Sequence, residues 1–346
     1  MSRMQESRIL TSRTRGPYAS VKITDVAALA GVAPMTVSRV LNTPDRVSEV
    51  TAARVRAAIE QLGYVPNLIA GGLSSRRSRM IAAIVPTIAN PMFSDPVQAF
   101  TDVMNQAGYH VLLGLSGYGG GDPERDLIRA VLARRPDGLL LTGATHPPEI
   151  IRLLRGAGVP IVEIWDATTT PTDMLVGFDH VEVGAAVADF FADRGHICFA
   201  MVGSDDSRGT LRRQGFVEGL TRRGGKVVAK HILPAPNTIA DGRVALRAIL
   251  PKLGPRTAIL AGSDLVAFGL ITEARMQGIA VPERLAVCGF GDMELCRESE
   301  PPITSVGVDG TAMGRLAAES LLARLSGRPA PSRVLVPFHI LARATT

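Results

Sequence analysis

Residues 25–42 read DVAALAGVAPMTVSRVLN, a stretch that predicts two short helices joined by a tight turn. The first helical pattern starts at Thr24, a good N-cap residue, and stops at Gly31, which suits a helix C-terminus. The second starts at Pro34, favoured in a first helical turn, and runs to Leu41. This spacing is typical of a helix–turn–helix, whose second helix enters the major groove of DNA. A helical hairpin used only for packing is the alternative interpretation.

A third helical pattern follows from Ser48 to Gly63 and completes a small apolar set. The expected inward residues of the three helices are Val26, Ala27, Ala30, Val37, Val40, Leu41, Val55, Ala58, Ile59 and Leu62. Helices this short are marginal by themselves, so we expect them to pack together as one all-α domain over residues 21–66.

The positive charge of the chain is concentrated beside this domain. Residues 1–80 hold 12 Lys+Arg and 5 Asp+Glu, whereas residues 81–346 hold 26 and 27. This excess indicates a polyanion-binding module on a near-neutral body, although a solvated basic tail would give the same numbers. Residues 1–20 lack hydrophobic periodicity, and we interpret them as a disordered basic arm.

Beyond a Gly-, Ser- and Pro-containing linker at 67–78, apolar runs alternate with helical patterns. The expected strands are 80–86, 110–115, 138–142, 160–165, 175–178, 197–203, 227–233, 258–261 and 285–290. The expected helices are 95–107, 123–134, 183–194, 211–223, 239–253 and 265–277. The alternation predicts parallel sheets with right-handed crossovers, and its length favours two α/β lobes. Ligands of such folds bind beyond the carboxyl ends of strands and between domains.

Several classes of protein are disfavoured by what the chain lacks. No apolar run approaches the roughly 20 residues of a membrane span, and residues 1–20 contain no apolar core of a secretory signal. Three scattered cysteines fit a reducing cytoplasm, and six scattered histidines form no metal motif. The glycine-rich GYGGGD at 117–122 lacks the lysine of a phosphate loop, so we interpret it as a flexible surface loop. We expect no cofactor, no metal and no catalysis.

Four segments together resemble the lactose/galactose repressor family of bacterial transcription regulators. They are DVAALAGVAPMTVSRVLN at 25–42, RVRAAIEQLGYVPNLIAGGL at 54–73, CGFGDM at 288–293 and PPITSVGVDGTAMGRLAAESLLARL at 301–325. The resemblance spans about Lys22 to Thr346. It implies a helix–turn–helix head, a hinge, and a two-lobed effector-binding and dimerisation module (79–346) of the periplasmic-binding-protein-like type I fold.

The same resemblance assigns DNA-binding residues. It implies that Pro34, Met35 and Arg39 read bases, and arginine is the natural partner of guanine. Thr36, Ser38 and Asn42 are candidates for phosphate contacts, and Thr24 is grouped with them. In the hinge, Leu73 stands where the family inserts a leucine into the minor groove, which would kink the DNA.

Two departures from the family pattern concern this head. Ala33 replaces the usual serine before the second helix, which removes a cap. Gly71 and Gly72 precede Leu73, and each glycine costs a helix about 1 kcal/mol relative to alanine. We therefore expect a hinge helix that is weak in the absence of DNA.

Within this family, the chain most resembles gluconate-operon repressors. The likeness rests on MTVSR, GYHVLLGLSGYGGGDPERD, PDGLLLTGATH, VPIVEIWD and VGFDH, at 35–39, 108–126, 136–146, 159–166 and 176–180. It implies gluconate or a related sugar acid as effector. It also implies lobes of about 79–164 with 293–323, and 165–292 with 324–346.

A sugar acid needs a cation for its carboxylate and polar groups for its hydroxyls. The resemblance offers Arg212, in RRQGF, and Arg208, although both could be solvated helix residues. The further effector-binding candidates are Met92, Phe93, His146, Asp166, Asp179, Ser263 and Asp264. Phe93 could equally be core, and Asp264 could serve its own helix N-terminus. Gly291 stands where relatives that bind neutral sugars often have an aspartate, which favours an anionic ligand, although the neighbouring Asp292 could supply the same carboxylate.

Taken together, these expectations predict a cytoplasmic, nucleoid-associated homodimer that represses sugar-acid catabolic genes. We expect it to dissociate from its palindromic operator when the effector binds. The same family could act as an activator or respond to another sugar or a sugar phosphate. A transport receptor is a rival, disfavoured by the basic head and the missing signal. A sugar-acid kinase is another, disfavoured by the missing phosphate loop. No added leucine heptads follow residue 343, so a tetramerising coiled coil is not expected.

Overall fold

The structure is a computed structural model that describes residues 20–65, 77–88, 91–118 and 121–346. Internal contacts divide the chain into a unit ending at Ser78 and a second unit, Arg79–Thr346, and each is considered by itself. The expected arm at 1–20 lies, except for Ser20, outside the described residues. The same holds for hinge residues 67–76, including Leu73.

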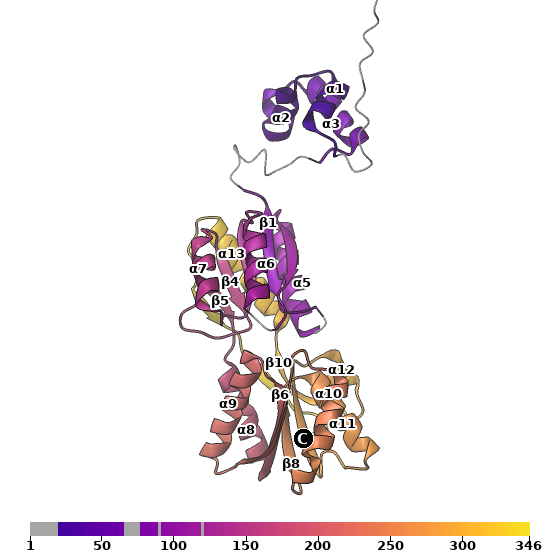
Figure 1. The fold of residues 1–346 in the computed structure, drawn as a ribbon, viewed down its shortest axis with the longest axis vertical. Coiled ribbons are helices and arrows are strands. Elements are labelled where there is room, and N and C mark those ends of the chain that lie inside the picture. Colours follow the sequence, from indigo (N-terminus) through magenta and orange to yellow (C-terminus); the bar gives the residue numbers. More distant parts are fainter. Residues whose placement is uncertain (1–19, 66–76, 89–90, 119–120) are drawn as a thin grey trace, which may run out of the picture. The chain divides into compact units, whose positions relative to one another are not determined.

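The first unit is a three-helix head (Figure 1). It contains α1 (Ile23–Ala30), α2 (Pro34–Asn42), a 3-10 turn η1 (Pro44–Arg46) and α3 (Glu49–Leu62). Its buried core is Val26, Ala27, Ala30, Val37, Val40, Ala52, Val55 and Ala58. Gly31 adopts a left-handed φ of 64° between α1 and α2, a conformation that glycine adopts without strain. The predicted helix–turn–helix and its third helix are confirmed.

Two details of the head differ from the sequence-based expectation. Thr24 is not the N-cap of α1, because the helix begins at Ile23 and the Asp25 carboxylate accepts the Lys22 backbone N–H at 2.7 Å. Leu41 is 37% exposed, since the helical turn of about 100° per residue after buried Val40 rotates it away from the core. Ala33 is the N-cap of α2 and supplies no side-chain hydrogen bond.

The first lobe of the second unit is built on a six-stranded parallel sheet. Its order is β11-β5-β4-β3-β1-β2. The strands are β1 (Met80–Val85), β2 (His110–Leu115), β3 (Gly138–Thr142), β4 (Ile161–Ile164), β5 (Met174–Gly177) and β11 (Arg333–Leu335). The core clusters place α5 (Ser94–Gln106) and α13 (Gly310–Leu325) on one face, and α6 (Asp122–Leu132) and α7 (Pro148–Gly156) on the other. A 3-10 turn, η2 (Pro91–Phe93), precedes α5.

The second lobe repeats this three-layer plan. Its sheet has the order β12-β10-β9-β8-β6-β7, in which only β12 is antiparallel to its neighbour. The strands are β6 (Cys198–Ser204), β7 (Val227–Leu233), β8 (Thr257–Ala261), β9 (Leu285–Phe290), β10 (Thr304–Val308) and β12 (Phe338–Leu341). One face carries α8 (His180–Asp193) and α9 (Ser207–Arg222), and the other α10 (Ile239–Ile249) and α11 (Asp264–Met276). The short elements η3 (Leu250–Lys252) and α12 (Glu294–Glu298) complete the lobe.

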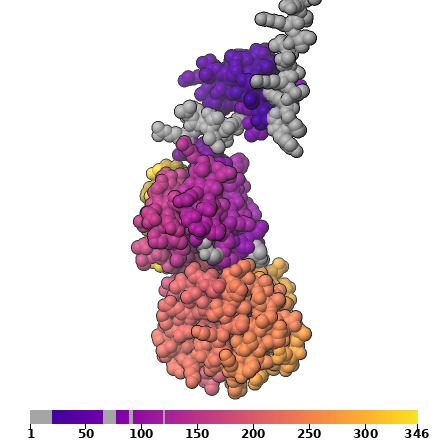
Figure 2. Space-filling view, viewed as in Figure 1, coloured from indigo at the N-terminus to yellow at the C-terminus, as the bar shows by residue number. Residues whose placement is uncertain are grey.

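All nine expected strands and all six expected body helices are present, but the expected lobe boundaries are wrong. The chain crosses between lobes after β5, between β10 and α13, and between β11 and β12. Consequently β5 and β11 belong to the first lobe and β10 to the second. Hydrogen-bonded strand pairing decides which lobe each strand belongs to, because β5 pairs with β4 and β10 pairs with β9. No local sequence pattern indicates these pairings. Figure 2 shows the lobe boundary as the change from magenta to orange.

Helices α8 and α9 lie side by side on their sheet (Figure 1) and touch backbone to backbone. An added Cβ at Gly215 would lie 1.9 Å from the Val181 carbonyl oxygen, and one at Gly184 would lie 2.0 Å from the Arg212 carbonyl oxygen. Only glycine permits this approach, which brings Arg212 of α9 against the first turn of α8.

Gly215→Ala is therefore expected to lower the free energy of unfolding of unit 79–346 by about 1–3 kcal/mol, because the helices must separate. Urea unfolding followed by circular dichroism measures this. The matched control is Gly156→Ala, at an exposed helix end where nothing lies within 4 Å of the added Cβ. Equal stability of Gly215→Ala and wild type would contradict the close-packing argument.

Within the part of the chain that the structure describes, no single helix has the length and hydropathy of a membrane span. Only α1 and α2 taken together pass that test, and they are bent by 101° at their junction.

Candidate DNA-facing helix and ligand pocket

Helix α2 presents a solvent-facing surface opposite its buried Val37 and Val40. Met35 is 63% exposed, Pro34, Arg39 and Asn42 are exposed, and Thr36 and Ser38 are half-buried. Thr24 is exposed on α1. The Asn42 amide donates to the Ser38 carbonyl oxygen at 2.9 Å, which keeps Asn42 along the helix. The expected DNA-binding residues in the described head are therefore accessible.

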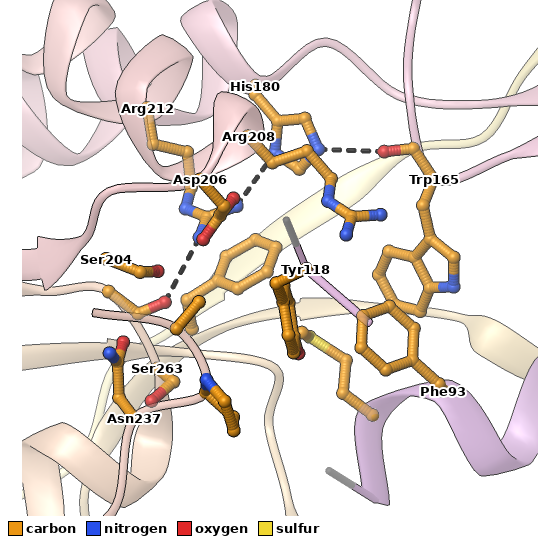
Figure 3. Close-up of a pocket in the computed structure, with 15 residues that line it drawn as sticks. Phe93, Tyr118, Trp165, His180, Ser204, Asp206, Arg208, Arg212, Asn237 and Ser263 are labelled. Carbon is orange, nitrogen blue, oxygen red and sulfur yellow. Dashed lines mark hydrogen bonds between the residues drawn. The ribbon is translucent and has the colours of Figure 1, made fainter. Parts of the chain in front are cut away.

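In the second unit, a pocket lies where the carboxyl ends of strands from both sheets meet, as expected for parallel α/β folds. Figure 3 shows the side chains that line it. The first lobe contributes Met92, Phe93, Tyr118 and Trp165. The second contributes His180, Ser204, Asp206, Arg208, Arg212, Ala235, Pro236, Asn237, Gly262, Ser263 and Phe290.

Arg212 is the buried cation of this pocket, with 6% of its surface exposed. Its guanidinium donates to His180 Nδ1 at 3.0 Å and to the Gly262 carbonyl oxygen at 3.1 Å, and it stacks 4.0 Å from the centre of the Phe290 ring. Burial lowers the pKa of Arg212 to about 10, so it stays charged at neutral pH. Figure 3 shows this arrangement, with Asp206 beside the guanidinium.

His180 is held neutral by its surroundings. Its Nε2–H donates to the Trp165 carbonyl oxygen at 2.8 Å, which leaves the Nδ1 lone pair to accept from Arg212. Burial, and then the charge of Arg212, hold the pKa of His180 well below its ordinary value. A neutral Nε2–H imidazole thus bridges Arg212 and the loop that carries Trp165.

Asp206 and Arg208 open helix α9 at the pocket wall. The Asp206 carboxylate caps the helix by accepting the Gly209 N–H at 2.9 Å. Burial alone would raise the pKa of Asp206, but hydrogen bonds from Ser204 and Gly209 and the nearby arginines lower it overall. The Arg208 guanidinium lies 5.4 Å from the Phe93 ring centre, and its Nη1 is buried without a hydrogen-bond partner.

A second compartment adjoins the first, since both are lined by Tyr118, Asp206 and Arg208. Its own polar residues are Ser116, Glu124, Thr142, Thr145, His146, Asp166 and Ser207. Asp166 Oδ2 accepts the Ala144 N–H at 2.7 Å, and His146 Nδ1 lies 3.0 Å from Glu124 Oε1. Burial raises the pKa of Asp166, against the opposing charge of Arg208.

Four residues around this second compartment each hold a buried polar atom that makes no hydrogen bond within the protein. The atoms are Thr142 Oγ1, His146 Nε2, Asp166 Oδ1 and Arg208 Nη1. Unpaired buried polar groups cost about 1–3 kcal/mol each, so their clustering indicates a site that a polar ligand completes.

Most expected effector residues meet at these two compartments, and two do not line them. Met92, Phe93, Arg208, Arg212 and Ser263 line the first, and His146, Asp166 and Arg208 the second. Asp179 instead caps α8 through the Val181 and Glu182 N–H groups. Asp264 accepts the Met293 N–H at 2.8 Å and the Ser305 hydroxyl at 2.6 Å, so both oxygens are occupied.

The position of Gly291 bears on the ligand's charge. The neighbouring Asp292 carboxylate forms an ion pair with Arg343 at 2.7 Å, and it lines neither of these two compartments. Asp292 instead lines a neighbouring hollow that shares Met92 and Trp165 with the first compartment.

Sequence reasoning missed Tyr118, Trp165, His180, Asp206 and Asn237, which all line the pocket. Tyr118 belongs to the stretch interpreted as a flexible surface loop, and its half-buried side chain lines the pocket. A usable signal existed, because each of the five follows the carboxyl end of a strand within a few residues. Among the described residues, no group of three or more His, Cys, Asp or Glu side chains is arranged to hold a metal ion.

The lowered pKa of His180 predicts a pH effect on stability. Between its folded pKa and about pH 6.5 the unfolded chain binds a proton that the folded chain does not, so this contribution to stability falls as pH falls. The difference in unfolding free energy between wild type and His180→Gln should shrink from pH 7 to pH 5, measured by urea unfolding. His339→Gln, at an exposed histidine, is the control. A pH-independent difference for His180→Gln would refute the argument.

Comparisons with known proteins agree with this architecture. Residues 22–67 match the family model "Bacterial regulatory proteins, lacI family", and residues 188–346 match "Periplasmic binding protein-like domain". The HTH-type transcriptional regulator GntR of Pseudomonas aeruginosa is 35% identical over 327 residues, which cover 94% of this chain and 95% of the relative.

Two solved structures are similar over nearly the whole chain. A LacI family transcriptional regulator from Silicibacter pomeroyi has a TM-score of 0.88 at 30% identity, covering 94% of this chain and 99% of the other. The lac repressor dimer bound to operator and an anti-inducer has a TM-score of 0.79 at 26% identity, with the same coverage. The helix–turn–helix head, the two-lobed body and a 35%-identical relative together show that this chain belongs to the lacI family of bacterial regulatory proteins.

Proposed function

We propose that this chain is a homodimeric, DNA-binding transcriptional repressor of sugar-acid catabolic genes, released from its operator by gluconate or a related acid. The observation that carries the proposal is Arg208, whose guanidinium Nη1 is buried without a hydrogen-bond partner at a polar pocket between the lobes, in a chain that also has a helix–turn–helix head. We place its action in the cytoplasm, at the nucleoid. The named relatives are transcriptional regulators, which supports a non-catalytic role.

In the proposed complex, residues 21–66 form the DNA-binding domain and α2 enters the major groove. Pro34, Met35 and Arg39 contact base edges, and Thr24, Thr36, Ser38 and Asn42 contact phosphates. The positive excess of residues 1–80 adds sequence-independent attraction to DNA. Hinge residues 67–78 connect the head to the body, with Leu73 as the minor-groove wedge.

The pocket supports an anionic, hydroxyl-rich effector. Arg208 and Arg212 supply two cations, and Ser204, Asn237 and Ser263 supply polar groups that suit hydroxyls. Because the lobes both contribute walls, a ligand there would favour one relative position of the lobes. The ligand changes the affinity for the operator only if the relative position of the lobes differs between the DNA-bound and the free protein.

A second copy of the chain would cover an apolar edge of the body. Edge strand β2 leaves Leu112, Leu113 and Leu115 about half exposed, at 48%, 48% and 51%. Exposed apolar edge strands invite pairing, and the lac repressor structure named above is a dimer. Two heads on one dimer would read the two halves of a palindromic operator.

Arg39→Ala is expected to lose about 1–3 kcal/mol of discrimination at one operator position, because a guanine contact disappears. Operators selected from a random DNA pool with wild-type protein would be titrated by fluorescence anisotropy at fixed salt. Lys230→Ala changes an exposed cation of the body and is the control. Unchanged sequence preference in Arg39→Ala would count against base reading by this residue.

Arg208→Gln is expected to weaken gluconate binding roughly 10- to 150-fold, since a charge-assisted hydrogen bond is worth about 1.5–3 kcal/mol. Calorimetry measures this, with Arg222→Gln, an exposed residue of the same helix, as the control. Operator affinity with and without gluconate is measured in parallel. Tight gluconate binding that leaves operator affinity unchanged would overturn the release mechanism.

A further inference from the structure

The second compartment differs in charge from the arginine-lined pocket beside it. Glu124 and Asp166 line it, and Glu163, fully buried on β4, lies 3.8 Å from His146 through its Oε1 atom. We call this side the acidic compartment and define it by its lining residues Glu124, His146 and Asp166. Arg208 stands at the boundary, because it lines both parts.

The unpaired atoms of the acidic compartment specify what can fill it. Asp166 Oδ1 is an acceptor when the carboxyl group is ionised, whereas the Thr142 hydroxyl and, depending on its protonation, the His146 ring nitrogen Nε2 can donate or accept. Arg208 Nη1 can only donate. A ligand that completes the set must therefore present an acceptor at Arg208 and at least one donor at Asp166.

Resting on the proposed function, we propose that the effector binds in one direction and carries a single negative charge. Its carboxylate lies at Arg208 and its hydroxyl tail enters the acidic compartment, where Asp166 and Glu124 reject a terminal phosphate. Asp166 and Glu124 thus determine the specificity for an unphosphorylated sugar acid. The pocket arginines determine that the ligand must carry an acid group.

Phosphate fits this compartment poorly for two reasons. Ionised phosphate oxygens only accept hydrogen bonds and leave Asp166 Oδ1 unpaired, whereas a hydroxyl both donates and accepts. A dianionic phosphate would also approach the carboxyl groups of Asp166 and of Glu124, which His146 pairs at 3.0 Å, and like charges juxtaposed in a binding site oppose binding. Arg213 offers no compensation, because it donates to the Ser204 carbonyl oxygen and to Thr210 Oγ1 and does not line either compartment.

The test is isothermal titration calorimetry of the full chain at pH 8 with D-gluconate, 6-phospho-D-gluconate and D-glucose. We expect D-gluconate to bind at least about tenfold tighter than either other ligand. Binding of the phosphorylated acid within a few fold of D-gluconate would overturn the inference and leave the proposed function standing. Failure of both acids to bind, or equal binding of D-glucose, would overturn the sugar-acid effector and the inference with it.

Charge-neutral variants test the two carboxylates directly. Glu124→Gln and Asp166→Asn should each narrow the preference for D-gluconate over 6-phospho-D-gluconate by about tenfold, because repulsion is removed. Glu149→Gln, at an exposed position of α7 in the same lobe, should leave the ratio unchanged. Calorimetric stoichiometry reports the folded fraction of each variant. If neither pocket variant changes the ratio of the two affinities, Glu124 and Asp166 do not determine the specificity. The ratio measured for the wild-type protein tests the inference even if both variants misfold.

Discussion

The buried guanidinium of Arg212 is the interaction on which the ligand pocket depends. A charge removed from water is costly unless its donors are paired, and here His180, the Gly262 carbonyl oxygen and the Phe290 ring surround it. Each partner comes from a different element of the second lobe. His180 in turn bonds to the Trp165 carbonyl oxygen, which extends the constraint to the first lobe. One cation therefore fixes the position of loops from both lobes.

Glycine contacts make this burial possible. Helices α8 and α9 approach each other at Gly184 and Gly215 more closely than any residue with a Cβ would allow. The approach places Arg212 beside the first residue of α8, within hydrogen-bond reach. The close contact between α8 and α9 thus determines both how these helices pack and where the charge of Arg212 lies in the pocket.

The two parallel sheets explain why residues far apart in sequence gather at this pocket. Parallel strands end at the same edge, so the loops after β1, β2 and β4 face those after β6, β7, β8 and β9. Polar groups in these short loops cannot all be satisfied by regular secondary structure. Several stay unpaired among the described residues, and they mark where the chain is suited to bind a polar ligand.

The sequence by itself determined the local structure and the family likeness. Hydrophobic periodicity, Gly31 and Pro34 specified the helix–turn–helix, and alternating apolar runs specified nine strands, because these signals act between near neighbours in the chain. Tertiary structure alone decided lobe membership and the partners of each polar side chain. Asp264 followed a strand end as a ligand-binding residue would, yet it bonds to Met293 and Ser305, whereas the overlooked His180 holds Arg212. Those pairings depend on contacts between residues 29 to 41 positions apart, which the packing of sheets and helices sets and no local pattern encodes.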